Sequence, residues 1–151
     1  MSKNNLNDIL KKIKQQAVKA LQTEGAIKGK EIYKKQTDEL LYKAQEPKDY
    51  ERTYELRDSI SSENYMGDKV RLFFDSDKIN PYSTEGWGQH QSLDGQDQSD
   101  KVADWMNDGH GGAYEQSGLH MKEATLDEIR RTKMIEKVVK DGLKKSGFKV
   151  K

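Results

Sequence analysis

Few residues of this chain have side chains suited to catalysis or metal binding, and its histidines are the first to consider. The chain holds three, His90, His110 and His120, at spacings of twenty and ten residues. Paired zinc ligands on a helix stand about four residues apart, so a metal site would need the fold to bring a carboxylate such as Glu115 beside them. Exposed or capping histidines in glycine-rich loops explain the same spacing, and the sequence favours that explanation.

Aspartates of the central segment form the second candidate set. Asp75 and Asp77, with Asp94, Asp97 and Asp100 further on, could be metal ligands of a nuclease or of a calcium loop. A helix–loop–helix calcium site alternates its ligands, with Gly at the sixth position and Glu at the twelfth, and the residues after Asp77 lose that order at once. Turn-forming aspartates that bond their own backbone explain the pattern better. We therefore expect no metal and no cofactor.

Nucleophilic catalysis has no signature here. The chain has no cysteine, which excludes disulfides, cysteine-ligated zinc or iron–sulfur sites and thiol catalysis. It also has no glycine-rich phosphate loop, nucleophile elbow or Ser/His/Asp order. We expect a protein that is not an enzyme and has no small-molecule substrate.

Length and composition predict one domain with a thin core. The 151 residues suit a single domain over 1–151, but 32% are apolar and 35% charged, against an apolar share of about 45–50% in globular domains. Part of the chain is then loop, or is ordered by neighbouring copies. The polar N-terminus and the lack of a run of about 20 apolar residues predict assembly in a cytoplasm and no membrane contact.

Charge is nearly balanced overall, at +1, but is segregated along the chain. Residues 1–45 hold ten lysines against five acids, residues 130–151 nine basic residues against two acids, and residues 75–108 two lysines against eight acids. Solvated helix faces explain this pattern, as does electrostatic complementarity between neighbouring subunits. The basic segment 1–45 has no arginine, and Tyr33 and Tyr42 are its aromatic residues, so we do not expect sequence-specific nucleic-acid binding.

A basic amphipathic helix is predicted over 1–45. Gly25 and Gly29 interrupt its pattern, which predicts one helix with a weak point, two helices in series or a bend, and Pro47 places the end before it. The apolar repeat at three- and four-residue spacing is made by Leu6, Ile9, Leu10, Ile13, Ala17, Ala20 and Leu21, and it resumes at Ile27, Ile32, Tyr33, Leu40, Leu41 and Ala44.

The segment 50–75 is predicted as an ordered arm followed by a β-hairpin. Alternating apolar residues favour an irregular entry into a strand at about 56–61. One turn of helix is the alternative, since it also fits the spacing of Tyr50, Thr53, Tyr54 and Arg57. The tyrosines are expected to pack between the arm and a helix, and the arginines to pair with acids of the same or a neighbouring subunit.

The clearest strand is 70–74, rich in branched and aromatic residues, and a turn over 64–68 makes it the second strand of the hairpin. A loop is predicted over 76–98, long enough to be functional or disordered. A short helix over 99–108 follows, with Ser99 as its N-cap and Gly109 as its C-terminal cap.

The last element is predicted as one helix over 120–147, which begins no later than Thr125. Thr125 to Glu128 has the pattern of a capping box, and Gly147 closes the helix. The expected fold is α+β: a long N-terminal amphipathic helix and a C-terminal helix packed on a small antiparallel sheet, with a long central loop and a short helix.

Three short segments of the sequence carry a resemblance to a known protein family. Residues 50–60 read Tyr-Glu-Arg-Thr-Tyr-Glu-Leu-Arg-Asp-Ser-Ile, residues 105–110 read Trp-Met-Asn-Asp-Gly-His, and the chain closes on Lys-Lys-Ser-Gly-Phe at 144–148. With the lysine-rich first helix, these segments resemble the neck and tail-completion proteins of long-tailed bacteriophages that infect Gram-positive hosts. The chain departs from that pattern at His110 to Gly112 and at His120–Met121.

The resemblance implies a structural virion protein of the phage neck, which forms or joins a ring between head connector and tail tube. Its implied partners are copies of itself, the adjacent connector and tail-tube or tail-terminator proteins, and DNA that passes through the channel. Its implied location is the virion, with assembly in the host cytoplasm. The alternative is a small nucleic-acid-binding or metal-dependent accessory protein. Candidate subunit and partner contacts are Tyr50, Arg52, Tyr54, Arg57, Asp94, Asp97, Asp100, Trp105 and His110.

Overall fold

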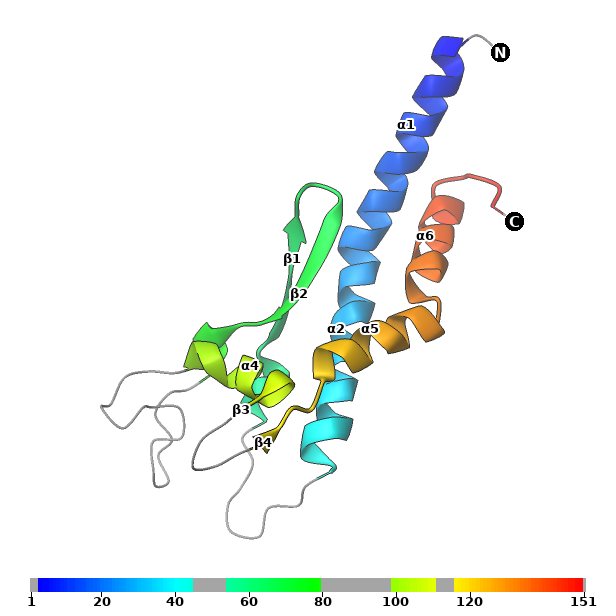
Figure 1. The fold of residues 1–151 in the computed structure, drawn as a ribbon. Helices are drawn as coiled ribbons and strands as arrows, with labels where there is room; N and C mark the ends of the chain where they lie inside the picture. The colour runs from blue at the N-terminus through cyan, green and yellow to red at the C-terminus, as the bar shows by residue number, and fades with distance from the viewer. Residues whose placement is uncertain (1–2, 45–53, 80–98, 111–115, 151) are drawn as a thin grey trace. The chain divides into compact units, whose positions relative to one another are not determined.

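The computed structural model describes residues 3–44, 54–79, 99–110 and 116–150 (Figure 1). The chain divides into two compact units, described separately below. Unit 1 comprises Met1–Glu31, Ser62–Leu72 and Asp127–Lys151, and unit 2 comprises Ile32–Ser61 and Phe73–Leu126. The expected single domain over 1–151 stays a prediction.

The N-terminal helix is one continuous helical run, as predicted. It consists of α1 (Lys3–Ala20), a π-helical turn (Leu21–Gly25), α2 (Ala26–Thr37) and a second π-helical turn (Asp38–Tyr42). The irregularity predicted near Gly25 is the first of these turns, a π-helical segment within the long helix. Gly29 serves a different purpose, because a Cβ there would stand 3.0 Å from Leu72 Cδ1. A glycine at this position lets the hairpin approach the helix closely.

The hairpin is confirmed as β1 (Ile60–Tyr65) and β2 (Lys69–Phe74), a two-stranded antiparallel sheet. Met66 and Gly67, at its turn, both have positive φ, 50° and 77°, which tight hairpin turns require.

The predicted strand entry at 56–61 is wrong for residues 56–59, and the strand begins at Ile60. Of the helical alternative, Arg57 lies in a helix, whereas Tyr54 precedes that helix with a positive φ of 57°. Residues Glu55–Asp58 form α3, a single helical turn. Leu56, Ser59 and Ile60 are buried, so the buried positions follow helical spacing before the strand begins. The Ser59 hydroxyl donates to the Leu56 carbonyl oxygen (2.8 Å) and stabilises this turn.

The short helix α4 spans Ser99–Asp108, as predicted, and Gly109, with φ of 92°, ends it. A 3-10 turn, Ser76–Lys78, opens the segment predicted as a loop, and residues 80–98 of that segment lie outside the described residues. Two short strands not predicted from the sequence, β3 (Gly109–His110) and β4 (Gln116–Ser117), pair antiparallel.

The C-terminal helix is two helices instead of one. α5 (Met121–Arg131) and α6 (Met134–Lys145) are separated at Lys133, whose φ is 51°. Thr125 does not cap a helix: it is buried inside α5, and its hydroxyl donates to the Met121 carbonyl oxygen (2.7 Å). A threonine four residues into a helix satisfies its hydroxyl this way, so the capping-box pattern was misleading.

The end of α6 agrees with the prediction. Gly147 has φ of 86°, and its N–H donates to the Lys144 carbonyl oxygen (2.9 Å), while the Phe148 N–H donates to that of Leu143 (3.0 Å). This pair of bonds is a Schellman cap, which favours glycine.

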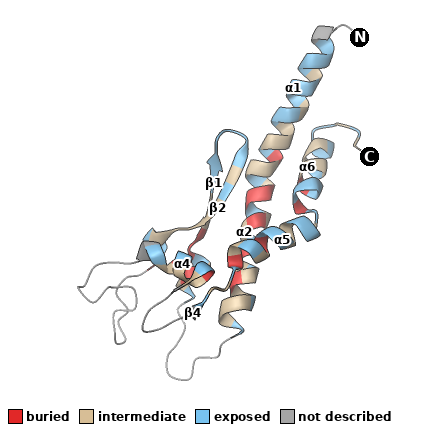
Figure 2. Cartoon of the chain, viewed as in Figure 1, coloured by how far each residue is buried: buried red, intermediate tan, exposed pale blue. Residues whose placement is uncertain are grey.

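The fold class is α+β, as predicted, and the core of each unit is small (Figure 2). In unit 1, α6 lies along α1, with Ala20, Met134 and Val138 buried. None of the described helices is long and apolar enough to cross a membrane. Among the described residues of unit 2, the buried apolar ones are Tyr33, Leu56, Ile60, Ile79, Ala103 and Met121.

Candidate functional site

The part of the tyrosine- and arginine-rich segment that is described folds back on the end of the long helix, within unit 2. The Tyr54 ring packs on the Tyr42 ring, with centroids 4.7 Å apart, and the Arg57 guanidinium lies 4.7 Å from the Tyr54 ring centroid. Arg57 Nε donates to Asp58 Oδ1 (2.9 Å) and Nη2 to Asp58 Oδ2 (3.1 Å), while Nη1 lies 3.4 Å from Asp38 Oδ1. Arg57 and Tyr54 therefore hold this chain's own arm in place.

Electrostatics of the segment follow from these contacts. Hydrogen bonds from Arg57 hold the pKa of the Asp58 carboxyl below its ordinary value, and the charges of Arg57 and Lys34 act in the same direction against the effect of burial. Burial raises the pKa of Tyr42. The guanidinium stays charged at every pH of interest, since these carboxylates raise the pKa of Arg57 further.

The Arg57 contacts give a stability prediction with a defined pH dependence. We expect Arg57→Met to lower the free energy of unfolding by about 1 kcal/mol, because it removes the ion pair with Asp58 and the cation–π contact with Tyr54. The loss is modest because the Arg57–Asp58 pair is partly exposed. The pKa of Asp58 is lowered in the folded chain, so the pair stabilises above pH about 4 and this contribution is lost as pH falls through the folded-state pKa.

Urea unfolding at several pH values and NMR titration of the Asp58 carboxyl test this prediction. In Arg57→Met the pKa of Asp58 should rise toward 3.8, whereas Arg130→Met, which removes an exposed arginine paired with Asp127, should leave it unchanged. An Asp58 titration that is the same in wild type and Arg57→Met would rule out the pairing.

The Trp-Met-Asn-Asp-Gly-His segment has a structural purpose in the fold of unit 2. Asn107 is fully buried, and its Oδ1 accepts the Lys122 N–H (2.8 Å) in the first turn of α5. Its backbone carbonyl accepts the His120 N–H (3.0 Å). A Cβ on Gly118 would lie 2.6 Å from that same carbonyl oxygen, so the chain passes too close for any other residue. Asn107 thus caps α5 from the end of α4.

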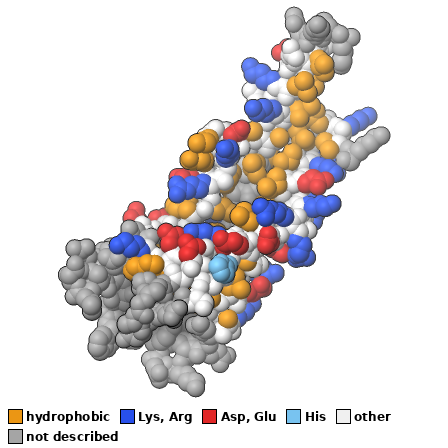
Figure 3. Space-filling view, in the orientation of Figure 1, with side chains coloured by type: hydrophobic (Ala, Val, Ile, Leu, Met, Phe, Trp, Pro, Cys, Tyr) orange, Lys and Arg blue, Asp and Glu red, His pale blue; other side chains and the backbone are white. Residues whose placement is uncertain are grey.

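Carboxylates surround this cap. Asp104 Oδ1 accepts from Lys122 Nζ (2.7 Å), and Asn107 Nδ2 donates to Asp108 and, at 3.4 Å, to Glu123. Figure 3 shows acidic side chains (red) gathered beside a histidine (pale blue) on the face in view. Within the described part of the chain, no group of three or more His, Asp and Glu residues is arranged to hold a metal ion.

A buried tyrosine lies within reach of the same charges. Tyr33 is 3% exposed, its ring meets the Phe74 ring edge-on at 4.9 Å, and its hydroxyl has no hydrogen-bond partner among the described residues. Burial raises the pKa of Tyr33, and the charges of Glu123, Asp104 and Asp108 raise it further.

We expect Tyr33→Phe to stabilise the protein by about 1 kcal/mol, because it keeps the ring and removes a buried hydroxyl that lacks a partner. Thermal unfolding measures the effect. Tyr33→Leu is the control and should destabilise, since it loses the ring packing on Phe74. A loss of stability in Tyr33→Phe would mean that the hydroxyl is bonded in solution.

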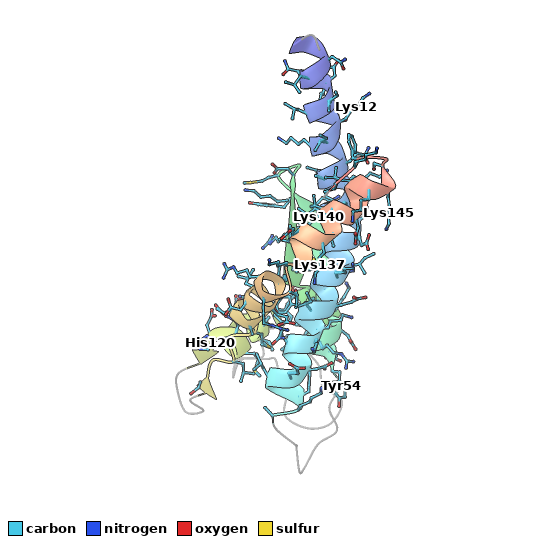
Figure 4. All side chains as sticks on the ribbon, turned by 90° about the vertical axis from the view of Figure 1, so that its right-hand side faces the viewer. Lys12, Tyr54, His120, Lys137, Lys140 and Lys145 are labelled. Carbon is cyan, nitrogen blue, oxygen red and sulfur yellow. The ribbon has the colours of Figure 1, made fainter. Side chains whose placement is uncertain are left out.

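Lysines dominate the exposed surface of unit 1. Figure 4 shows Lys12 on α1 and Lys137, Lys140 and Lys145 on α6. Two of them pair within the unit: Lys140 with Glu136 (3.0 Å) and Lys145 with Glu24 (3.1 Å). Hydrogen bonds from Lys145 and Lys28 lower the pKa of Glu24.

A groove of about 530 Å³ in unit 1 lies between α1 and the hairpin turn. Lys11, Lys14 and Lys19 line it on the helix, and Met66 and Asp68 line it on the turn. The groove therefore presents three ammonium groups beside an exposed methionine.

Net charge divides between the two units more sharply than along the sequence. Unit 1 contains 18 Lys and Arg against 9 Asp and Glu, a net charge of +9, and unit 2 contains 9 against 17, a net charge of −8. The two charges nearly cancel, since the chain as a whole carries +1. The two units are therefore oppositely charged and of similar magnitude.

The structure places some of the residues predicted as contacts and not others. Tyr54 and Arg57 come together beside Tyr42, at the end of the long helix. Trp105 is half-buried on α4. Asp100 and His110 are described by their backbone, in α4 and β3. The remaining four predicted residues, Tyr50, Arg52, Asp94 and Asp97, lie outside the described residues.

Sequence reasoning missed Asn107, Gly118 and Tyr33. Asn107 stands directly before Asp108-Gly109, at the end of a predicted helix, which was the available signal for a capping residue. Its partner lies 15 residues further on, and no local pattern identifies it.

Comparison with known families adds a match over most of the chain. The model of the family described as YomN matches residues 5–145. This family is associated with phages, which indicates a phage protein. No curated protein and no solved structure matches the chain significantly.

Proposed function

Because the chain belongs to the phage-associated YomN family, we propose that it is a structural protein of the phage neck. In this proposal it forms or joins a ring between the head connector and the tail tube, completes the tail, and performs no catalysis. It contacts copies of itself, the connector and the tail-tube or tail-terminator proteins. DNA passes through the ring without sequence-specific binding, and the mature location is the virion.

The observation that carries the proposal is the division of charge, +9 in unit 1 and −8 in unit 2. A subunit with opposite charges on two bodies attracts the opposite body of a second copy. Such a head-to-tail contact is heterologous, and with a closing rotation it builds a ring.

The small cores support the same proposal. Among the described residues each unit buries few apolar side chains, while large apolar residues of unit 1 such as Leu6, Leu10 and Ile27 are half exposed. A subunit of an assembly has this balance, because neighbouring copies supply part of the area that it buries.

Mass in solution tests this function. Light scattering should report a defined multimer of the purified chain, or a monomer that converts to a ring when mixed with connector or tail-tube subunits of the same phage. A monomer that ignores all of these subunits at high concentration would contradict the proposal.

A second candidate, an accessory protein that binds nucleic acid, rests on the lysine-lined groove of unit 1. Lys11, Lys14 and Lys19 could neutralise phosphates without reading sequence. Fluorescence anisotropy with duplex DNA at 50 to 200 mM salt decides it: about tenfold or greater weakening across that range supports DNA binding. No binding at the lower salt rejects it.

A further inference from the structure

We propose that the apolar face at the start of α1 docks on the acidic unit 2 of a second copy of this chain. This inference rests on the proposed function and deepens it, since it names the two surfaces that join neighbouring subunits. We call the face the α1 stripe: Leu6, Ile9, Leu10 and Ile13.

The α1 stripe continues a surface that is already used for packing. Further along the helix, α6 covers the same side of α1: Gly142 stands against Ala20, and the Ser146 hydroxyl donates to Gln16 Oε1 (3.0 Å). These residues follow Leu6 and Ile13 at spacings of three, four and seven residues, and so share one helix face.

Beyond the end of α6 this face is partly open, with Ile9 and Ile13 half-buried. In Figure 1, α1 extends past α6, and Lys12 in Figure 4 marks this extension. Leu6 is 50% and Leu10 54% exposed. α6 thus packs on this face of α1 at Gln16 and Ala20, and the stripe continues the same face toward the start of α1.

The lysines beside the α1 stripe favour an acidic partner surface. Lys12 and Lys14 lie on either side of it by helical geometry. The sequence of α1 holds five lysines against one acid, Asp8. Two copies of α1 would repel each other, so the occupant is acidic. A membrane surface is disfavoured, because α1 has no aromatic residue to anchor it.

Unit 2 of a second copy has the required chemistry. It carries a net charge of −8, and Asp104 and Glu123 are exposed around the Asn107 cap. Leu126, one turn along α5 from Glu123, is 51% exposed. This surface offers carboxylates to Lys12 and Lys14 and an apolar contact to the stripe.

The first test removes the apolar contact. Sedimentation velocity of Leu6→Ala/Leu10→Ala should show self-association about tenfold weaker or more than wild type, because both side chains are buried in the contact. The matched control is Ile27→Ala/Ile135→Ala, which removes two equally exposed residues of unit 1 (55% and 50%). The control should associate like wild type.

The second test exchanges the charges. Lys12→Glu/Lys14→Glu and Asp104→Lys/Glu123→Lys should each weaken self-association, and the four substitutions combined in one chain should restore it. Arg130→Glu/Arg131→Glu gives unit 1 the same charge change away from the stripe, at two residues 74% exposed, and should have the smaller effect. Circular dichroism confirms that each variant is folded.

The outcomes separate this inference from the proposed function. Equal association of the stripe variant and wild type, no rescue in the fourfold variant, or a strictly monomeric wild type overturns the docking contact. The neck function still stands if that wild type joins connector or tail-tube subunits. Binding of wild type to anionic vesicles, without self-association, would assign the stripe to a membrane and also overturn the inference.

Discussion

Gly142→Val should destabilise the protein by about 3 kcal/mol. A Cβ at position 142 would collide with the Ala20 Cβ across the contact between α6 and α1 in unit 1. Adding side-chain volume to a packed interface costs about 1–3 kcal/mol, and here two helix backbones would have to separate. Valine has a better helix propensity than glycine, by a few tenths of a kcal/mol, which offsets little of this cost. Urea unfolding of the two proteins measures the difference.

An exchange of methyl groups controls for helix propensity. Gly142→Ala alone should destabilise although alanine favours the helix by about 1 kcal/mol. Combined with Ala20→Gly, it moves the methyl from one helix to the other and should recover most of the lost stability. If Gly142→Val is as stable as wild type, α6 does not pack on α1 through this contact.

Asn107→Ala should cost about 2–3 kcal/mol. The substitution leaves the Lys122 N–H, in the first turn of α5, without the Oδ1 acceptor at 2.8 Å, and an N-cap contact contributes about 0.5–2 kcal/mol. It also opens space at a fully buried position and removes the Nδ2 donor from Asp108 and Glu123, whose carboxylates then lose a compensating partner. Hydrogen exchange should show α5 losing protection first.

Asn64→Ala is the control, because Asn64 is exposed on β1, and its replacement should change stability by less than about 0.5 kcal/mol. An Asn107→Ala protein with wild-type stability and unchanged protection of α5 would show that the side chain does not cap the helix.

Elements with a local cause were predictable from the sequence. The long first helix followed from its apolar repeat, and Gly109 and Gly147 were identified as helix ends because glycine adopts positive φ without strain. The hairpin of β1 and β2 followed from a strand pattern with turn residues beside it. Each of these signals acts within a few residues of the element that it specifies.

The errors came from features decided by distant contacts or by unusual backbone. Lys133 ends α5 with a positive φ, a conformation for which lysine gives no signal. The residues next to Thr125 in the sequence fit a helix cap and a position inside a helix equally well. In the structure Thr125 is a buried residue within α5.

The candidate contacts show the same limit. Arg57 was expected to pair with acids, and it bonds the adjacent Asp58 (2.9 Å). Its second, longer contact is with Asp38, 19 residues away, and no local pattern identifies that partner. The division of charge between the two units was visible along the sequence as basic ends and an acidic middle. The net charges of the units, +9 and −8, became apparent only once the structure showed which segments of the chain form each unit.

The neck function has one most direct test: electron microscopy of particles made by the parent phage when the gene for this chain is deleted. We expect DNA-filled heads and complete tails that fail to join, with joining restored by wild-type protein supplied from a plasmid. Normal, infectious virions in the absence of this chain would contradict the account.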